Sequence, residues 1–142
     1  MLTKPVEQFK ALAHPARLRI LAMLRPGSLC VCQIVEPLAL APSTVSAHLA
    51  ELRRAGLIEE SKQGRWVHYR LSQDSKTARV LRWVWRELET DPQIAADADL
   101  VAKLREIPLT ELCRTGVRPR PRRVGVAGSL SKKAATRKRK RP

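Results

Sequence analysis

The change from helical to strand spacing near the middle of the chain constrains the fold most strongly. Apolar residues recur at helical intervals across residues 42–54, and two short β-type runs follow, Leu57–Ser61 and Trp66–Leu71. The segment Lys62–Arg65 between these runs predicts a hairpin turn, with Gly64 supplying a positive φ. A helix followed at once by a β hairpin predicts a small wing beside a helix pair.

Helical spacing predicts further helices on both sides of this hairpin. Pro42 fits the first position of the 42–54 helix, where a missing N–H does no harm, whereas Pro37 would interrupt or fray the helix before it. Together the segments predict a mainly α fold with a small β-hairpin wing, a winged helix-turn-helix. The other expected helices are Thr3–Ala13, Ala16–Leu24, Cys30–Leu40, Ser75–Glu89 and Pro92–Ile107, with one more turn at Pro108–Cys113.

The first helix and the residue after it carry two local predictions. Thr3 is available as an N-cap, and Val6 and Phe9 share the face that we expect to pack. His14, directly before Pro15, could be a metal ligand or a helix cap. We favour the cap, because no second His, Asp or Glu lies at helical spacing to complete a chelate.

The helix expected at 75–89 carries more apolar surface than a single small domain needs on its flank. We therefore expect a partner subunit to cover it, which predicts a homodimer. The apolar residues on this helix are Val80, Leu81, Val84, Trp85 and Leu88.

Basic charge is concentrated at the C-terminal end. The formal net charge is +15, and residues 117–142 hold 11 Lys or Arg and no acidic residue. Dense positive charge favours a nucleic-acid partner, although a basic tail can also serve solubility alone. We expect a DNA-binding and dimerisation domain at 1–90, a helical extension at 91–116 and a disordered tail at 117–142.

Other classes of protein are not indicated. The chain has neither a secretory signal nor an apolar stretch near the roughly 20 residues that span a bilayer, so we expect a cytoplasmic protein without a membrane partner. It shows no phosphate-binding glycine loop, catalytic triad or paired carboxylates, and we expect no enzyme.

Three cysteines are too few, and odd in number, for a disulfide framework, so they indicate metal, metalloid or redox chemistry. Residues two apart on a regular helix point about 200° apart, so Cys30 and Cys32 cannot bind one ion from an intact helix. The pair must lie at a helix end or distort it. A helix N-terminus would also favour the thiolate form that binds soft ions.

Four motifs in the same order carry a resemblance to a known family. They are Phe9–Leu21, Leu29–Cys32, Ser43–Leu49 and Gly64–Leu71, within about residues 5–90. The chain resembles the ArsR-type arsenic-responsive repressors. This resemblance implies a homodimeric repressor that leaves double-stranded operator DNA when trivalent arsenic or antimony binds cysteine thiolates, with no organic cofactor.

The sequence departs from that family pattern around the cysteine pair. Ser28 and Gln33 stand where acidic residues are frequent, and Val35 stands where some members carry a third cysteine. Cys113 is the remaining thiol, and a soft three-coordinate ion would prefer it beside Cys30 and Cys32. Alternatively, Cys113 is a small buried hydrophobic residue.

Candidate DNA contacts follow from position in the predicted motif. Hydroxyl and imidazole groups of the 42–54 helix would face the major groove, and basic wing residues would reach the backbone or minor groove. Thr44 or Ser46 could instead be satisfied within the helix, and His48 could stabilise the helix pair. The candidates are Ser43, Thr44, Ser46, His48, Lys62 and Arg65.

Two other functions remain open. The first is a thiol redox switch, in which Cys30 and Cys32 oxidise and Cys113 resolves the product. The second is an architectural protein that binds nucleic acid nonspecifically through its basic tail.

Overall fold

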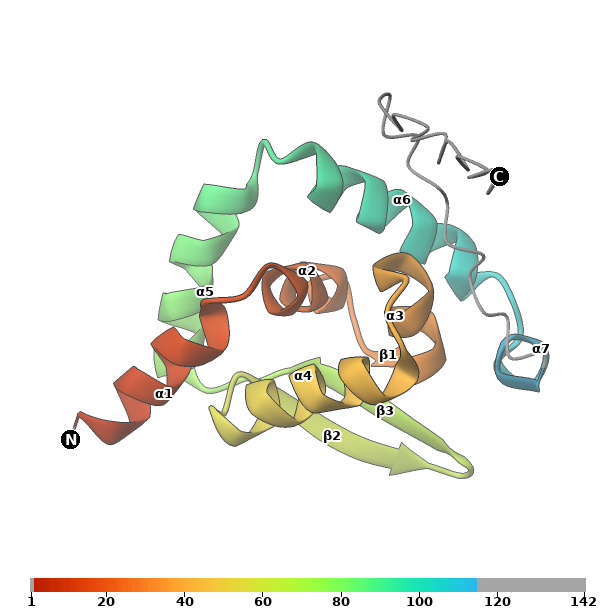
Figure 1. Ribbon diagram of the computed structural model, residues 1–142, viewed down its shortest axis with the longest axis horizontal. Helices are drawn as coiled ribbons and strands as arrows, with labels where there is room; N and C mark the ends of the chain where they lie inside the picture. Colours follow the sequence, from red (N-terminus) through yellow and green to blue (C-terminus); the bar gives the residue numbers. More distant parts are fainter. Residues whose placement is uncertain (1, 115–142) are drawn as a thin grey trace, which may run out of the picture.

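A computed structural model describes residues 2–114 of the chain (Figure 1). The predicted basic tail, 117–142, lies outside the described residues. The elements are α1 (Thr3–Leu12), α2 (Pro15–Leu24), β1 (Leu29–Cys30), α3 (Val31–Leu38), α4 (Pro42–Arg54), β2 (Ile58–Gln63), β3 (Trp66–Leu71), α5 (Ser75–Leu88), α6 (Pro92–Arg105) and α7 (Leu109–Arg114).

The predicted winged helix-turn-helix is confirmed. Helix α4 is followed by an antiparallel β2–β3 hairpin, with Lys62 paired to Val67 and Gln63 to Trp66. Gly64 in the turn has a φ of 61°. In Figure 1, α4 lies beside this hairpin, and α5 and α6 form an arc around α2.

The structure adds a strand that the sequence did not predict. Leu29 pairs with Tyr69 and Cys30 with His68, so β1 joins a three-stranded sheet in the order β1-β3-β2. The expected third helix is therefore wrong at its start, because Cys30 belongs to β1. A strand of two residues is too short to show alternation, which explains the error. The same helix passes Pro37 but ends at Leu38 instead of Leu40, with Ala39 in the left-handed conformation.

Two predictions for α1 are wrong. Thr3 is the first helical residue, and Leu2 at the N-cap makes no side-chain cap. Val6 and Phe9 are 44% and 64% exposed, while the face of Gln8 is turned inward. The Gln8 amide nitrogen donates to the Thr77 hydroxyl of α5 at 3.4 Å, so a polar contact holds this helix face inside the protein.

One hydrophobic core connects all the helices from α1 to α6. Helix α2 runs through its centre, and the predicted inner face of α4 is buried, which confirms that helical register. Side chains with relative exposure below 2% include Ile20, Leu21, Leu24, Leu29, Ile34, Val45, Leu49, Leu52 and Leu57. Within residues 2–114, no helix combines the length and the apolar composition needed to cross a membrane.

The wing turn depends on glycine. Gly64→Ala is expected to lower the free energy of unfolding by about 1 kcal/mol, because an L side chain at positive φ is strained. Gly27→Ala is the matched control, since its added methyl would lie 3.6 Å from the nearest atom of Arg105, an ordinary contact. Urea unfolding of both variants measures the difference, and equal stability of the two would contradict the assigned turn.

Candidate functional site

Cys30 lies at the junction between β1 and α3. It is the N-cap of α3 and has extended backbone angles, φ −74° and ψ 153°. Cys30 and Gln33 form a capping box, in which the Gln33 side-chain oxygen accepts a hydrogen bond from the Cys30 N–H at 2.9 Å and the Cys30 sulfur faces the backbone N–H of Gln33. The sulfur of Cys30 therefore lies where it helps to begin the helix.

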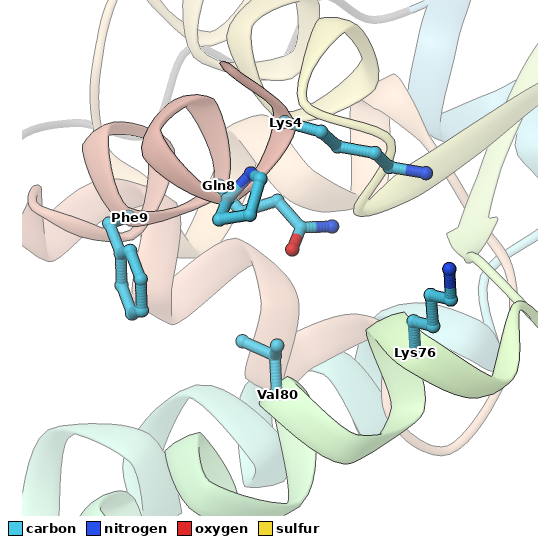
Figure 2. A pocket seen from close by; sticks show the side chains of 6 residues that line it. Lys4, Gln8, Phe9, Lys76 and Val80 are labelled. Carbon is cyan, nitrogen blue, oxygen red and sulfur yellow. The ribbon is translucent and has the colours of Figure 1, made fainter. Parts of the chain in front are cut away.

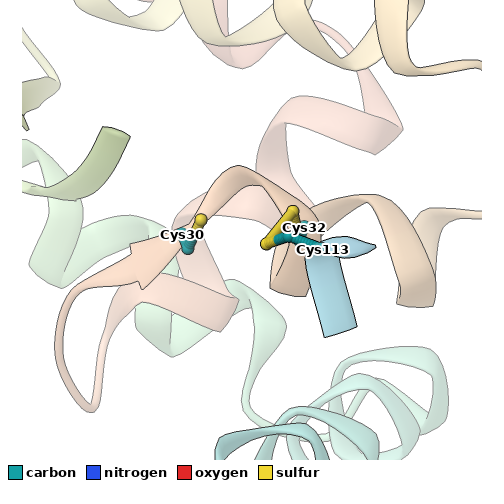
Figure 3. Close-up of side chains that lie close together, drawn as sticks. All are labelled: Cys30, Cys32 and Cys113. Atoms are coloured by element: carbon teal, nitrogen blue, oxygen red, sulfur yellow. A yellow bond between two sulfur atoms is a disulfide. The ribbon is translucent and has the colours of Figure 1, made fainter. Parts of the chain in front are cut away.

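The three cysteines of the chain meet at this junction (Figure 3). Cys32 lies in the first turn of α3, and Cys113 comes from α7, 81 positions further along the chain. A disulfide joins Cys32 to Cys113, with their Cα atoms 5.8 Å apart, and Cys30 is a free thiol. All three sulfur atoms lie within 4.8 Å of one another.

This arrangement fits a soft ion once the disulfide is reduced. Thiolates prefer soft ions, and three sulfur atoms that share one ion at about 2.3 Å can all lie no more than about 4.0 Å apart. The observed limit of 4.8 Å is larger by less than about 1 Å, so side-chain movements of that size would bring the three sulfur atoms onto one ion. Cys30 is 1% exposed, whereas Cys32 and Cys113 are half-buried, which leaves access from the side of α7.

The cysteine junction adjoins the helix that supports α4. Helix α3 packs against α4, and Ile34 and Leu38 of α3 share the core with Val45 and Leu49 of α4. A displacement of the first turn of α3 would therefore change the packing beneath α4.

The exposed face of α4 carries three of the predicted DNA-contact residues. Ser43, Thr44 and Ser46 are all exposed. The helix begins after Ala41, which provides no side-chain cap because a methyl group cannot accept a hydrogen bond. Uncapped N–H groups at a helix N-terminus suit a phosphate oxygen.

His48 is half-buried, and its contacts are those of a residue that joins two helices. Its Nδ1 atom lies 3.3 Å from a guanidinium nitrogen of Arg17 on α2. Its ring centroid is 4.3 Å from that of His14, which caps α2 by accepting from the Ala16 N–H at 3.0 Å. The predicted cap at His14 is confirmed.

The pKa of His48 lies below its ordinary value. Burial disfavours the charged ring, and the neighbouring charges of His14 and Arg17 act in the same direction. His48 is therefore held in its neutral form between α2 and α4 near neutral pH.

The two basic wing residues are exposed on the β2–β3 hairpin. Lys62 lies on β2, and the Arg65 guanidinium lies 5.9 Å from the ring centroid of Trp66. In a winged helix-turn-helix whose recognition helix enters the major groove of DNA, wing residues at these positions lie beside the phosphate backbone.

Sequence reasoning missed two residues at these sites. Gln33 was noted only as a departure from the family pattern, although a capping residue followed three positions later by Gln is a recognisable capping-box spacing. Arg17 also donates to the carbonyls of Ala11 at 2.6 Å and Lys10 at 3.1 Å, so it ties α1, α2 and His48 together. No local spacing signals that role.

The fold, the exposed face of α4 and the wing together define a winged helix-turn-helix DNA-binding protein. Residues 14–60 match the model of the family described as bacterial regulatory protein, arsR family. The chain is 42% identical to the arsenical resistance operon repressor of Escherichia coli K12 over 85 residues, which is 58% of this chain and 73% of the relative. The chain belongs to the ArsR family of transcriptional regulators.

Solved structures agree with this assignment. HlyU from Vibrio cholerae N16961 is 37% identical, with a TM-score of 0.54, and the match covers 58% of this chain and 89% of HlyU. The homodimeric winged helix-turn-helix DNA-binding domain from Mycobacterium bovis, fragment 1–100, is 31% identical, with a TM-score of 0.56 and coverage of 62% and 81%. These relatives match the domain that carries α4 and the wing.

The lowered pKa of His48 predicts a pH dependence of stability. The unfolded chain takes up a proton near pH 6.5 that the folded chain resists, so the free energy of unfolding falls as the pH drops through 6.5 toward the lowered pKa. His48→Gln is expected to lose less stability than wild type between pH 7.5 and 5.5. Urea titrations at both pH values test this, with the non-titrating Thr44→Ala as the matched control. An identical pH dependence in wild type and His48→Gln would contradict the assignment.

Proposed function

We propose that this protein is a metalloid-responsive transcriptional repressor, which binds operator DNA as a homodimer and is released when trivalent arsenic or antimony binds Cys30, Cys32 and Cys113. The observation that carries the proposal is the meeting of three sulfur atoms within 4.8 Å at the start of α3. The similarity to the arsenical resistance operon repressor supports the choice of ion.

The coupling between ion and operator follows from the capping box. Binding draws the Cys30 sulfur toward Cys32 and away from the Gln33 N–H, and it thereby weakens the cap that begins α3. Because α3 packs against α4, a change at the start of α3 would also change the surface of α4 that faces the major groove of DNA. A coupling of about 1.4 kcal/mol changes operator affinity tenfold.

Operator recognition would use α4 and the wing. Ser43, Thr44 and Ser46 lie exposed on α4 and would contact base edges and phosphates, while Lys62 and Arg65 would contact the backbone. His48 contacts Arg17 and His14, so we assign it chiefly to the α2–α4 junction, with any contact to DNA made through its exposed edge.

A homodimer would cover the apolar surface that α1 and α5 leave exposed. The α5 residues expected to need a partner pack instead on the chain's own core, with Leu81 and Val84 buried in it. The exposed aromatic side chains are Phe9 on α1, at 64%, and Trp83 on α5, at 58%. Figure 2 shows Phe9 and Val80 lining one pocket between these helices, with a volume of about 320 Å³. An exposed aromatic side chain in such a pocket, with a second one exposed elsewhere on α5, favours a second copy of the chain as the cover.

A cytoplasmic location fits this proposal, because a reducing compartment keeps Cys32 and Cys113 as thiols that are free to bind an ion. The basic segment 117–142 would add affinity for phosphates without sequence preference.

A thiol redox switch is the second candidate, and the Cys32–Cys113 disulfide is the observation that favours it. Peroxide would oxidise the two thiols to this disulfide and would itself be reduced to two water molecules. The bond would tie α7 to the first turn of α3, the same place at which an ion would act.

Operator release by arsenite separates the roles of the thiols. Under a phosphine reductant, Cys30→Ser and Cys32→Ser are each expected to need at least about tenfold more arsenite than wild type, equivalent to about 1.4 kcal/mol. Cys113→Ser should show a smaller increase, because Cys30 and Cys32, the two cysteines at the start of α3, both remain. Fluorescence anisotropy with DNA selected by the protein from a random pool provides the measurement.

Ser28→Ala, an exposed change beside the pair, is the matched control and should respond as wild type does. Operator release by arsenite that is unchanged in all three cysteine variants would contradict the proposed metalloid site. Wild type that ignores arsenite under reductant, but is released by peroxide once reductant is removed, would establish the redox switch instead.

A further inference from the structure

The C-terminal arm, defined as α6 and α7, lies along α3 (Figure 1). Its inner face is apolar, with Val101 and Leu104 of α6 and Leu112 of α7 all buried. Apolar packing is non-directional and does not by itself fix where along α3 the arm stops. Two polar contacts supply that position.

The first contact ties α6 to the far end of α3. The Arg19 guanidinium of α2 donates to both carboxylate oxygens of Asp97, at 2.7 and 2.9 Å, and to the carbonyl oxygen of Pro37 at 3.0 Å. Asp97 is 3% exposed and also accepts from Gln93 at 3.0 Å. A bidentate pair on a buried carboxylate has a defined geometry, so it sets the position of α6 against the last turn of α3.

The second contact ties the end of α6 to the segment before the cysteine pair. Arg105, the last residue of α6, donates to the carbonyl oxygens of Gly27 at 3.1 Å and Ser28 at 3.2 Å. Ser28 lies two positions before Cys30, and α7 with Cys113 begins four positions after Arg105. Arg105 therefore joins the segment before Cys30 to the end of α6, which leads into α7 and Cys113.

We propose that Asp97 and Arg105 are positioning residues, which hold the C-terminal arm so that Cys113 of the same chain is delivered to Cys30 and Cys32. The identity of the ion rests on the proposed function, whereas the delivery of the thiol does not. Cys113 is 81 positions from Cys32, so closing this loop costs conformational entropy that the two contacts offset in part. They raise the effective concentration of the Cys113 thiol at the site.

The equilibrium with glutathione measures this effective concentration without any metalloid. One glutathione disulfide is reduced to two glutathione thiols as Cys32 and Cys113 become a disulfide. Asp97→Asn and Arg105→Gln are each expected to lower the effective concentration at least about tenfold, the change that a loss of about 1.4 kcal/mol produces. Full-length protein is used throughout, and far-ultraviolet circular dichroism under reductant checks that each variant is folded.

Two exposed residues on the same helix provide matched controls. Asp99→Asn and Lys103→Gln remove the same kinds of charge from α6 and should stay within about twofold of wild type. Non-reducing electrophoresis should show the wild-type disulfide within single chains. An unchanged equilibrium in both Asp97→Asn and Arg105→Gln, or a disulfide that joins two wild-type chains, would overturn the proposal.

Sulfur counting at bound arsenic gives a second readout, which a merely stabilising role would not move. X-ray absorption at the arsenic edge should find three sulfur neighbours in wild type and in Asp99→Asn, and a value falling toward two in Asp97→Asn and Arg105→Gln. Three sulfur neighbours in all four proteins would count against positioning. If wild type binds no arsenite, the metalloid function fails, and the glutathione equilibrium still decides the role of the arm.

Discussion

The hydrogen bonding at Cys30 is the constraint on which the rest of the site depends. This residue ends β1, where it pairs with His68 of β3, and it is also the N-cap of α3, where its N–H is bound by Gln33 at 2.9 Å. A single backbone position thus connects the wing strand to the helix beneath α4. Because Cys30 is 1% exposed, its sulfur cannot change partner without disturbing one of these elements.

Helix α3 is held on two sides by structures of different character. Helix α4 packs on it through the hydrophobic core, whereas the C-terminal arm contacts it through Arg19 with Asp97 and through the Cys32–Cys113 disulfide. The apolar side transmits displacement, since a close-packed core does not absorb it. In the proposed mechanism, the C-terminal arm determines when a displacement occurs, because it brings the third sulfur to the pair.

The hairpin, the positive φ of Gly64 and the buried apolar spacing of α4 were predictable, since each depends on local spacing. The turn itself is shorter than predicted, because Lys62 and Gln63 pair within β2 and leave only Gly64 and Arg65 between the strands. The strand β1 was not, because two residues show no period and the pairing partner lies on β3. The inward face of α1 was also mispredicted, since Gln8 is buried through Thr77, 69 positions away. Cys113 could be named as a candidate but not placed, because Cys32 lies 81 positions away and no local spacing relates the two residues.

Competition between ion and operator for one conformation of α3 is the central claim, and thermodynamic reciprocity tests it directly. Arsenite affinity should be measured by calorimetry, under reductant, for the free protein and for the protein saturated with operator DNA. Bound operator should weaken arsenite binding by the same factor, at least about tenfold, by which arsenite weakens operator binding. Equal arsenite affinity in the two states would contradict it.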